Sequence, residues 1–425
     1  MSAPSPDERA DVLVVGAGLA GLATATGLAR RGHDVVLADR RPALDGVVRT
    51  TGIFVRRTLD DFPLPPEHLG PAIRRVVLHP PGPGRPLDLV SDRDEYRVGD
   101  MGPLYRASAR AAVAAGVRLE LGARYAGRDG GACVLEGREG RRAVRARFLV
   151  GADGARSAVA RDLGLDRNRH LLVGAEEVRA VPDRGLPPTF HCVVDPSVAP
   201  GYLAWVVDDG HHAHVGVAGY ADRFPGGMRR SLERFKRSLP ALLGADAGAW
   251  ARDTWAGDTW GGDTWGGDTW GGDTRVGQAR ADEAPGAVER RGGPIPVGGL
   301  LRRIAGPDGL LVGDAAGAVS PLTAGGLDPC LRQAAQAVDV LDAALRSEGP
   351  QALRRYDGAA LRRAFRGRML LRHGLAQVRS PALVRAGFPL LRTPPGRAAA
   401  RAVLFGDRSF PDAPAERASP SGATA

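Results

Sequence analysis

Residues 11–21 read Asp-Val-Leu-Val-Val-Gly-Ala-Gly-Leu-Ala-Gly, an apolar run that leads directly into three closely spaced glycines. The run Asp11–Val15 predicts a short, buried parallel strand. The alanine- and leucine-rich segment Leu19–Arg31, which Gly32 follows, predicts a helix. Asp34–Ala38 predicts a second buried strand, so the chain is expected to begin with a βαβ unit.

The glycines of this unit have the spacing of a dinucleotide-binding turn. Gly16 permits the tight turn, Gly18 lets a pyrophosphate approach the backbone, and Gly21 lets the helix pack closely on the strand. Asp39 ends the second strand 23 residues after Gly16, where its carboxylate can accept hydrogen bonds from adenosine ribose hydroxyls. An acid at this place disfavours a 2′-phosphate, so the unit predicts bound FAD or NAD.

Two later motifs narrow this choice. Gly151-Ala-Asp-Gly-Ala-Arg-Ser157 follows a predicted strand at 148–150, and Leu311-Val-Gly-Asp-Ala-Ala-Gly317 follows another. Together with the first motif they resemble the glutathione-reductase-type FAD fold of aromatic hydroxylases, flavin halogenases and geranylgeranyl reductases. The resemblance implies that Asp153 and Gly154 lie near the FAD diphosphate and that Asp314 holds a ribityl hydroxyl. On physical grounds alone, Asp314 is also suited to cap a helix.

The segment after the third motif indicates the branch. Aromatic hydroxylases usually carry a histidine there, whereas this chain has Gly317 and then Ser-Pro-Leu-Thr-Ala-Gly-Gly-Leu at 320–327. This segment resembles the geranylgeranyl reductase form, which implies that the backbone N–H groups of Gly325, Gly326 and Leu327 stabilise negative charge on reduced flavin. A halogenase needs a catalytic lysine in its N-terminal part, and the sole lysine here is Lys236.

The same resemblance assigns further residues. Arg40 and Arg49 stand where FAD contacts are expected. Tyr202 and Trp205 resemble the Tyr-x-Trp signature that lines an isoprenoid cavity in these reductases, with one more residue between them than the signature has. Thr50 stands where archaeal members carry a cysteine beside the flavin, and it is also expected in the substrate cavity. No Asp, Glu or His is placed by the sequence as a general acid, so no catalytic residue is assigned.

The favoured function is an FAD-dependent oxidoreductase of the geranylgeranyl-reductase-like branch. It would transfer hydride from reduced flavin to a C=C bond of a small apolar, isoprenoid-like substrate. The alternatives are an FAD-dependent monooxygenase that hydroxylates an aromatic or polyketide-like substrate and a non-catalytic FAD-binding electron carrier. The chain has one dinucleotide fingerprint, so NAD(P)H is expected to bind only transiently, unless a reductase partner supplies the electrons.

The predicted fold class is α/β: a Rossmann-like parallel sheet, an antiparallel-sheet substrate lobe and a helical C-terminus. The FAD domain is expected to be discontinuous, at 1–55, 95–165 and 288–345, and the substrate lobe at 56–94 and 166–287. The segment 346–410 is expected to be helical and the tail 411–425 disordered. Residues 253–275 repeat Asp-Thr-Trp-Gly-Gly, which favours an exposed loop expanded by duplication over an aromatic flap on the substrate.

Composition excludes several classes of protein. The 425 residues carry a net charge of +10, but only one of the 58 basic residues is a lysine, so a general arginine bias is favoured over nucleic-acid binding. Three scattered cysteines indicate no disulfide framework. The close histidines His211, His212 and His214 favour a strand or turn over a metal site. No apolar run is long enough for a membrane span, and no signal peptide is evident at the N-terminus.

A cytoplasmic location is therefore expected. The one local feature that points elsewhere is the basic stretch that begins at Arg362. Its arginines alternate with apolar residues, which fits either a solvated helix face over the core or peripheral contact with an anionic membrane. This stretch contains Arg362, Arg363, Arg366, Arg368 and Arg372 among Leu361, Phe365, Met369 and Leu370.

Overall fold

The computed structural model describes residues 8–44, 48–182, 185–224, 226–244, 247, 288–406 and 411. The predicted repeat at 253–275 lies outside these residues, as does all of the predicted tail except residue 411.

The first motif belongs to an eight-stranded sheet. Its central strands β18, β11, β1, β2 and β8 are parallel and lie side by side in that order, with the short β17 antiparallel at one edge. The antiparallel strands β9 and β10 extend it beside β11. The strands are β1 (Glu8–Val15), β2 (Val35–Asp39), β8 (Arg118–Leu121), β9 (Arg124–Asp129), β10 (Ala132–Gly137), β11 (Gly140–Gly151), β17 (Ala305–Gly306) and β18 (Gly309–Leu311). Every residue of β2 is buried, as expected for a parallel strand that is covered on both faces.

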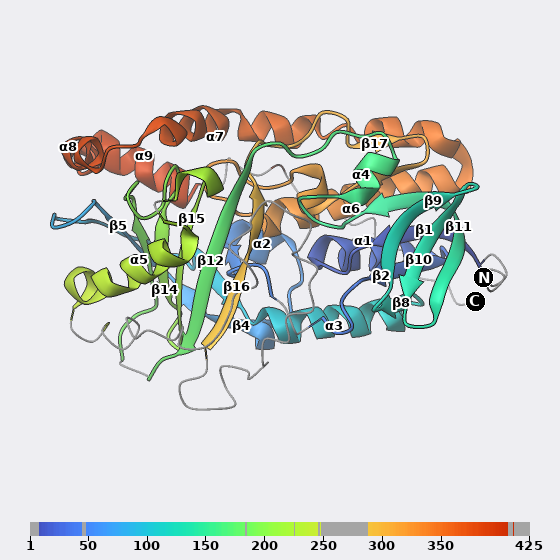
Figure 1. Cartoon of the computed structure of the whole chain (residues 1–425), viewed down its shortest axis with the longest axis horizontal. Coiled ribbons are helices and arrows are strands. Elements are labelled where there is room, and N and C mark those ends of the chain that lie inside the picture. The colour runs from blue at the N-terminus through green and yellow to red at the C-terminus, as the bar shows by residue number, and fades with distance from the viewer. Residues whose placement is uncertain are drawn as a thin grey trace, which may run out of the picture.

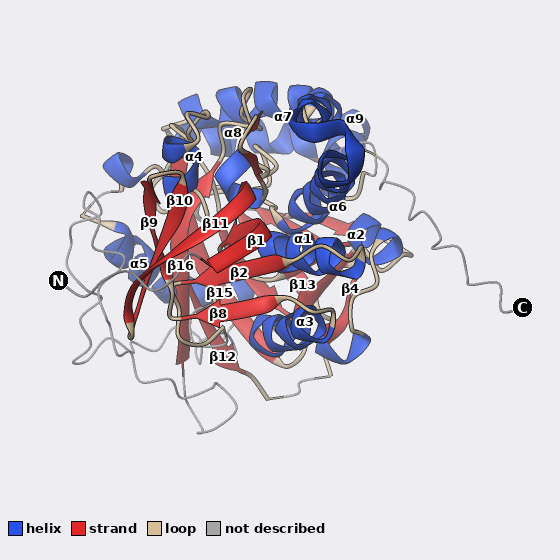
Figure 2. Ribbon diagram, turned by 90° about the vertical axis from the view of Figure 1, so that its right-hand side faces the viewer, coloured by secondary structure: helices blue, strands red, loops and turns tan. Residues whose placement is uncertain are grey.

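Three helices pack together beside this sheet (Figure 2). They are α1 (Leu19–Arg30), α3 (Met101–Ala114) and α6 (Leu327–Ala343), and α1 contacts both of the others. At the α1–α6 contact, a Cβ added to Gly27 would lie 2.7 Å from a methyl carbon of Val338. The absence of a side chain at Gly27 therefore allows the first and last parts of this unit to pack closely. The short helix α4 (Ala158–Asp162) follows β11.

A second, seven-stranded sheet lies beside the first unit (Figure 1). Its order is β16-β12-β15-β14-β13-β5-β6, and every neighbouring pair is antiparallel except β13 and β5. The strands are β5 (Arg75–His79), β6 (Leu87–Val90), β12 (Leu171–Ala180), β13 (Thr189–Val193), β14 (Ala204–Asp208), β15 (His212–Gly219) and β16 (Val288–Pro296). Helix α5 (Met228–Leu243) packs on β12 and β15 through an apolar cluster that includes Leu232, Phe235 and Val215.

A small third sheet occupies the region between residues 49 and 99, most of which was expected in the substrate lobe. Strand β7 (Tyr96–Gly99) pairs with both β3 (Ile53–Val55) and β4 (Leu69–Ile73), and helix α2 (Arg56–Asp61) follows β3 directly. The chain enters this sheet at β3, directly after residues 49–52, and leaves it from β7 into α3.

The C-terminal part is helical and runs along one side of the molecule (Figure 1). Its helices are α7 (Ala359–Gln377), α8 (Pro381–Leu391) and α9 (Pro394–Leu404). Two of the arginines expected on a solvated or membrane-facing surface, Arg368 and Arg372, are instead buried and donate hydrogen bonds inward. Among the described residues, no helix has the length and apolar character that crossing a bilayer requires.

The predicted fold class is confirmed: a parallel sheet, a largely antiparallel second sheet and a helical C-terminus are all present. The domain limits remain a prediction. Because β16 pairs along its length with β12, we propose that residues 288–296 belong to the substrate lobe and not to the FAD domain.

Candidate functional site: an FAD cradle beside a buried polar chain

The glycines of the first motif differ in what surrounds them. Gly16 has a φ of +105°, and a Cβ there would overlap the carbonyl oxygen of Ala152 in the second motif. A Cβ on Gly21 would overlap the carbonyl oxygen of Gly16. In contrast, no protein atom lies within 4 Å of the Cβ position of Gly18. The first and third glycines are therefore required by the chain itself, and the second leaves open space, as a pyrophosphate needs.

Asp39 closes this turn from the end of β2. Its Oδ2 accepts a 2.7 Å hydrogen bond from the amide of Ala17, and both of its carboxylate oxygens accept hydrogen bonds from the Arg41 guanidinium. Burial alone would raise the pKa of Asp39, but the bonds from Arg41 and Ala17 outweigh burial and lower it. Asp39 is therefore an ionised carboxylate in contact with the glycine turn. Asp39 was expected from the sequence, whereas Arg41 was not.

Positive charge gathers around this end of the site. Arg40 and Arg49 are exposed, and both are predicted FAD contacts. Partial desolvation, followed by repulsion from Arg40 and Arg41, lowers the pKa of the Arg49 guanidinium. Three neighbouring guanidiniums around the single carboxylate of Asp39 favour an anionic ligand such as a diphosphate.

The second motif lies against the first, because Ala152 fills the space next to Gly16 and Gly21. The side chain of Asp153, however, turns to its own helix. Its oxygens accept hydrogen bonds from the Ser157 hydroxyl at 2.5 Å and from the amides of Ala158 and Val159 at the start of α4. Gly154 follows with a φ of +85°. Asp153 thus fixes α4 next to the glycine turn, and its predicted place near the diphosphate stays a prediction.

The third motif supplies a carboxylate without a protein partner. Asp314 is partly buried at the end of β18, and its side chain has no hydrogen bond to any described residue. Burial raises its pKa to about 6. The main chain around it is fixed, because Asn168 donates to the Asp314 carbonyl and Gly313 donates to Gln333. The Asp314 carboxylate is therefore available to a ligand hydroxyl, and it caps no helix.

The first turn of α6 lies over this carboxylate. The Asp314 Oδ1 is 3.4 Å from the Cβ position of Gly326, the residue that precedes the helix. The backbone amides of Gly325, Gly326 and Leu327 have no acceptor among the described residues. Such amides at a helix N-terminus carry partial positive charge. Together, the open space at Gly18, the Asp314 carboxylate and these amides fit an FAD molecule that extends from the glycine turn to α6.

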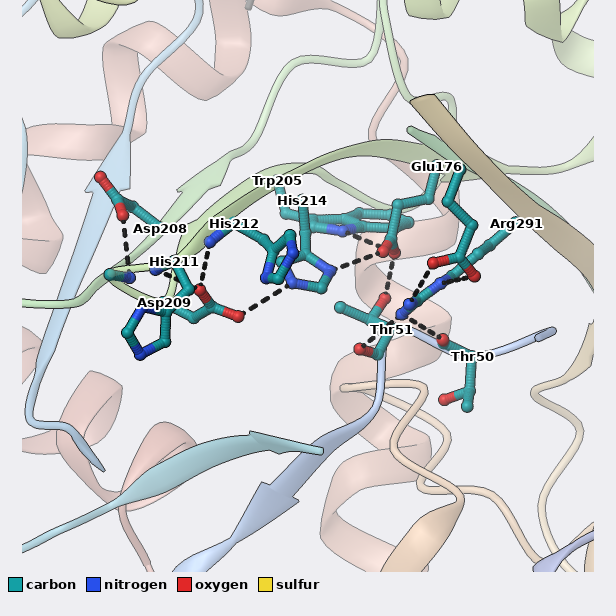
Figure 3. Close-up of polar contacts among 12 residues, drawn as sticks. Thr50, Thr51, Glu176, Trp205, Asp208, Asp209, His211, His212, His214 and Arg291 are labelled. Atoms are coloured by element: carbon teal, nitrogen blue, oxygen red, sulfur yellow. Dashed lines mark hydrogen bonds and ion pairs between the residues drawn. The ribbon is translucent and has the colours of Figure 1, made fainter. Parts of the chain in front are cut away.

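A buried polar chain that was not expected from the sequence lies on the second sheet (Figure 3). Glu176 of β12 is at its centre. Its Oε1 accepts from the His214 ring at 3.0 Å, and its Oε2 accepts from the Thr51 hydroxyl and, at 3.3 Å, from the Trp205 indole N–H. The other ring nitrogen of His214 lies 3.2 Å from the Asp209 carboxylate. A carboxylate in the apolar strand Leu171–Ala180 was the signal that could have revealed this chain.

The predicted cavity residues fall in two places. Tyr202 and Trp205 are buried in one apolar cluster, which also contains Phe388 and Phe405 from the C-terminal part. Thr50 is partly buried, and its carbonyl accepts a 3.3 Å hydrogen bond from Arg291 of β16. Thr50 therefore adjoins the polar chain, and Tyr202 adjoins the C-terminal helices through Arg372, whose guanidinium carbon is 5.7 Å from the centre of its ring.

The three close histidines have different surroundings. His211 is exposed and His212 partly so, whereas His214 is buried between two carboxylates. Across the described ranges, no group of three or more His, Cys, Asp or Glu side chains has an arrangement that could hold a metal ion.

Comparison with protein families agrees with an FAD site. The family described as FAD dependent oxidoreductase matches residues 11–64, and the FAD binding domain family matches residues 104–212. These two matches cover the first and second motifs. The cofactor of this protein is FAD.

Known relatives identify the branch. The chain is 31% identical over 335 residues to digeranylgeranylglycerophospholipid reductase 1 of Methanopyrus kandleri, a match that covers 76% of this chain and 77% of the relative. A shorter match, 35% identical over 207 residues and 39% of this chain, is to aklavinone 12-hydroxylase RdmE of Streptomyces purpurascens, of which it covers 36%.

A solved structure shares the whole fold. The geranylgeranyl bacteriochlorophyll reductase-like protein of Thermoplasma acidophilum superposes with a TM-score of 0.73 at 20% identity, over 94% of this chain and 98% of that one. With the sequence match over three quarters of the chain, these similarities show that this protein is an FAD-dependent oxidoreductase that belongs to the digeranylgeranylglycerophospholipid reductase family, the geranylgeranyl-reductase-like branch of these flavoproteins.

Proposed function

We propose that this enzyme reduces a C=C bond in an apolar, isoprenoid-like substrate. When bound, FAD supplies the hydride. The protein binds the cofactor, orients the substrate and excludes water from the reacting bond. The relative from Methanopyrus kandleri is named for a lipid that carries geranylgeranyl chains, which supports a substrate of this class.

One observation carries this proposal. The side chains that correspond to the isoprenoid-cavity signature, Tyr202 and Trp205, belong to a single apolar cluster built from the second sheet, the small sheet and the C-terminal helices. At one edge of this cluster Trp205 donates to Glu176, and near Tyr202 the buried Arg372 guanidinium borders it. Apolar surroundings of this kind favour a hydrocarbon chain over a polar substrate.

The FAD contacts are part of the proposal. The glycine turn with Asp39 and Arg40 would bind the adenosine and diphosphate, while Asp153 and Gly154 would adjoin the diphosphate. Asp314 would accept from a ribityl hydroxyl. The amides at Gly325–Leu327 would stabilise negative charge on the reduced flavin ring, with Arg49 beside it.

The test is an anaerobic incubation of reduced holoenzyme with a digeranylgeranylglyceryl phospholipid, followed by mass analysis of the lipid. Reduction predicts a gain of two hydrogens for each double bond. The shorter match to aklavinone 12-hydroxylase supports the alternative of a monooxygenase, for which an aromatic polyketide substrate would gain one oxygen atom, and only in air.

Peripheral membrane contact is proposed for α7 and α8. Between Ala359 and Gly406 the chain has ten arginines and no Asp or Glu. Leu370, Leu371, Leu383 and Leu390 of these two helices are all exposed. Exposed leucines in a stretch that has arginines and no acidic residue suit an anionic lipid surface, from which a lipid substrate would be drawn.

A further inference from the structure

Four polar side chains form a continuous line from the turn between β14 and β15 to the loop before β3. They are Asp209, His214, Glu176 and Thr51, and neighbouring members are hydrogen-bonded throughout (Figure 3). Three of the four are less than 9% exposed, so the line is shielded from water for most of its length. A fully connected chain of this kind inside an apolar sheet is costly unless every member has partners.

Strand pairing explains how the line forms. Glu176 is paired with Gly216 of β15, and Gly216 is paired with Trp205 of β14, so the three positions form one row across the sheet. A Cβ on Gly216 would overlap the Trp205 indole ring, so the glycine makes room for the ring that donates to Glu176. His214 is two residues from Gly216 and therefore on the same face of the sheet.

The charges along the line favour a proton held on His214. Burial would lower the pKa of His214, but its bonds to Asp209 and Glu176 outweigh burial and raise it. Likewise, burial would raise the pKa of Glu176 and of Asp209, but the bonds from His214 lower both. Each shift favours an imidazolium between two carboxylates over the neutral form of the line.

Other charged or titratable groups lie around His214. Arg291 of β16 lowers the pKa of His214, but its guanidinium is itself paired with Glu289 at 2.8 Å through two nitrogens. The His212 ring is 6.4 Å from the His214 ring, centre to centre. At the outer end, Asp209 accepts from the amides of His211 and His212, and His211 is exposed to solvent.

The inner end of the line, Thr51, lies in the loop that is predicted to adjoin the flavin. Thr51 follows Arg49 and Thr50, both of which the family resemblance assigns to the cofactor and substrate region. Arg291 donates at 3.3 Å to the carbonyls of both Thr50 and Thr51, which fixes this loop to the sheet. The Thr51 hydroxyl, which donates to Glu176, is therefore held in the loop whose two preceding residues are assigned to the cofactor and the substrate.

We propose that Asp209, His214, Glu176 and Thr51 form a proton relay that supplies the proton required with each hydride. This inference rests on the proposed reduction of a C=C bond. The Thr51 O–H bond breaks as a C–H bond forms on the substrate, and the Thr51 oxygen regains a proton from Glu176. His214 protonates Glu176 through Nδ1, and rotation of the carboxyl group carries that proton to the oxygen that faces Thr51.

The hydride brings both electrons from reduced FAD, which a two-electron donor such as NAD(P)H or a reductase restores. The alkene gains two C–H bonds, and His214 is left neutral until a proton returns past Asp209 from solvent. In this scheme Thr51 is the catalytic residue, while Glu176, His214 and Asp209 are positioning residues that act through it.

The experiment measures flavin reoxidation when pre-reduced holoenzyme is mixed anaerobically with the geranylgeranyl lipid. Thr51→Val is expected to slow this step about 100-fold, whereas Thr51→Ser, which keeps the hydroxyl, should stay near the wild-type rate. Chemical reduction of the flavin should be equally fast in all variants. In the wild type, the rate should fall as pH rises through the raised pKa of His214, and this decline should be absent in His214→Asn.

Glu177→Gln is the matched control for Glu176→Gln. The two residues are adjacent and equally buried, but Glu177 lies on the opposite face and bonds to Lys236 at 2.8 Å. Glu177→Gln should lower thermal stability without slowing reoxidation, and Glu176→Gln should slow it. Wild-type reoxidation rates in Thr51→Val, or an unchanged pH profile in His214→Asn, would overturn the relay alone. A wild-type enzyme that the lipid does not reoxidise overturns the proposed reduction as well.

Discussion

The Asp314 carboxylate lies next to Gly326, the residue that precedes α6. Its Oδ1 is 3.4 Å from the Cβ position of that glycine. No described side chain or amide binds this carboxylate, and burial raises its pKa to about 6. A group of this kind destabilises the empty protein and is retained for a ligand.

Asp314→Asn is therefore expected to weaken FAD binding yet to stabilise the apoprotein. Because the folded pKa is higher than the unfolded value of 3.8, ionisation opposes folding, and the penalty grows as pH rises from about 4 to about 6. Above pH 6 the variant should gain up to about 3 kcal/mol over the wild type. Urea unfolding of both apoproteins across this pH range measures the difference. A variant that is less stable than the wild type at pH 7 would contradict the account of Asp314.

The three glycines of the first motif should respond differently to alanine. At Gly16 and Gly21 the new Cβ would overlap backbone atoms, so these variants should be strongly destabilised or fail to fold. At Gly18 there is space for a Cβ, so Gly18→Ala should fold normally and lose FAD. Thermal unfolding and the flavin content of the purified proteins separate the two effects. If Gly18→Ala retained full FAD affinity, the pyrophosphate would not lie at this turn.

The sole lysine is expected to be structural. Lys236 is 1% exposed, and its ammonium group donates to Glu177. Lys236→Met leaves a buried carboxylate with one cation fewer, which should lower the free energy of unfolding by about 3 kcal/mol. The double variant Lys236→Met with Glu177→Met should recover part of this loss. Reoxidation of the flavin by substrate should be unchanged in the folded fraction, whereas a loss of turnover would assign Lys236 to the chemistry.

The membrane proposal predicts binding to vesicles. Leu383 and Leu390 of α8 are 70% and 69% exposed, and serine at both positions should weaken binding to anionic vesicles about tenfold. High salt should also weaken it, because the arginines contribute. Val113→Ser on α3, at an apolar site that is 54% exposed, is the control and should have no effect. Equal co-sedimentation of all three proteins would refute a lipid-binding role for α8.

The local geometry that follows from neighbouring residues was predictable, and the FAD contacts assigned to those residues stay predictions. The glycine turn with Asp39 and the third motif with Asp314 depend on residues next to strand ends, and their types and spacing are visible in the chain. Arg41 was missed because its contact with Asp39 depends on how the chain turns after β2, and that turn has no sequence pattern of its own.

The parts that depend on distant strand pairing were not predictable. Strand β5 pairs with β13, more than a hundred residues later, and the proline-rich sequence around β5 shows no clear alternation. The His211–His214 cluster drew attention as neighbours in sequence, yet only His214 joins the polar chain, and it does so through Glu176 across the sheet. The strand register that brings His214 of β15 next to Glu176 of β12 has no pattern that a single sequence reveals.

The central claim is that this flavoenzyme reduces a carbon–carbon double bond. Its most direct test is the mass of a geranylgeranyl lipid after anaerobic incubation with the reduced holoenzyme. The account predicts a gain of two hydrogens per reduced bond, with oxidation of the flavin in the same proportion. An unchanged lipid, together with an oxygen-dependent gain of one oxygen atom on an aromatic substrate, would contradict it.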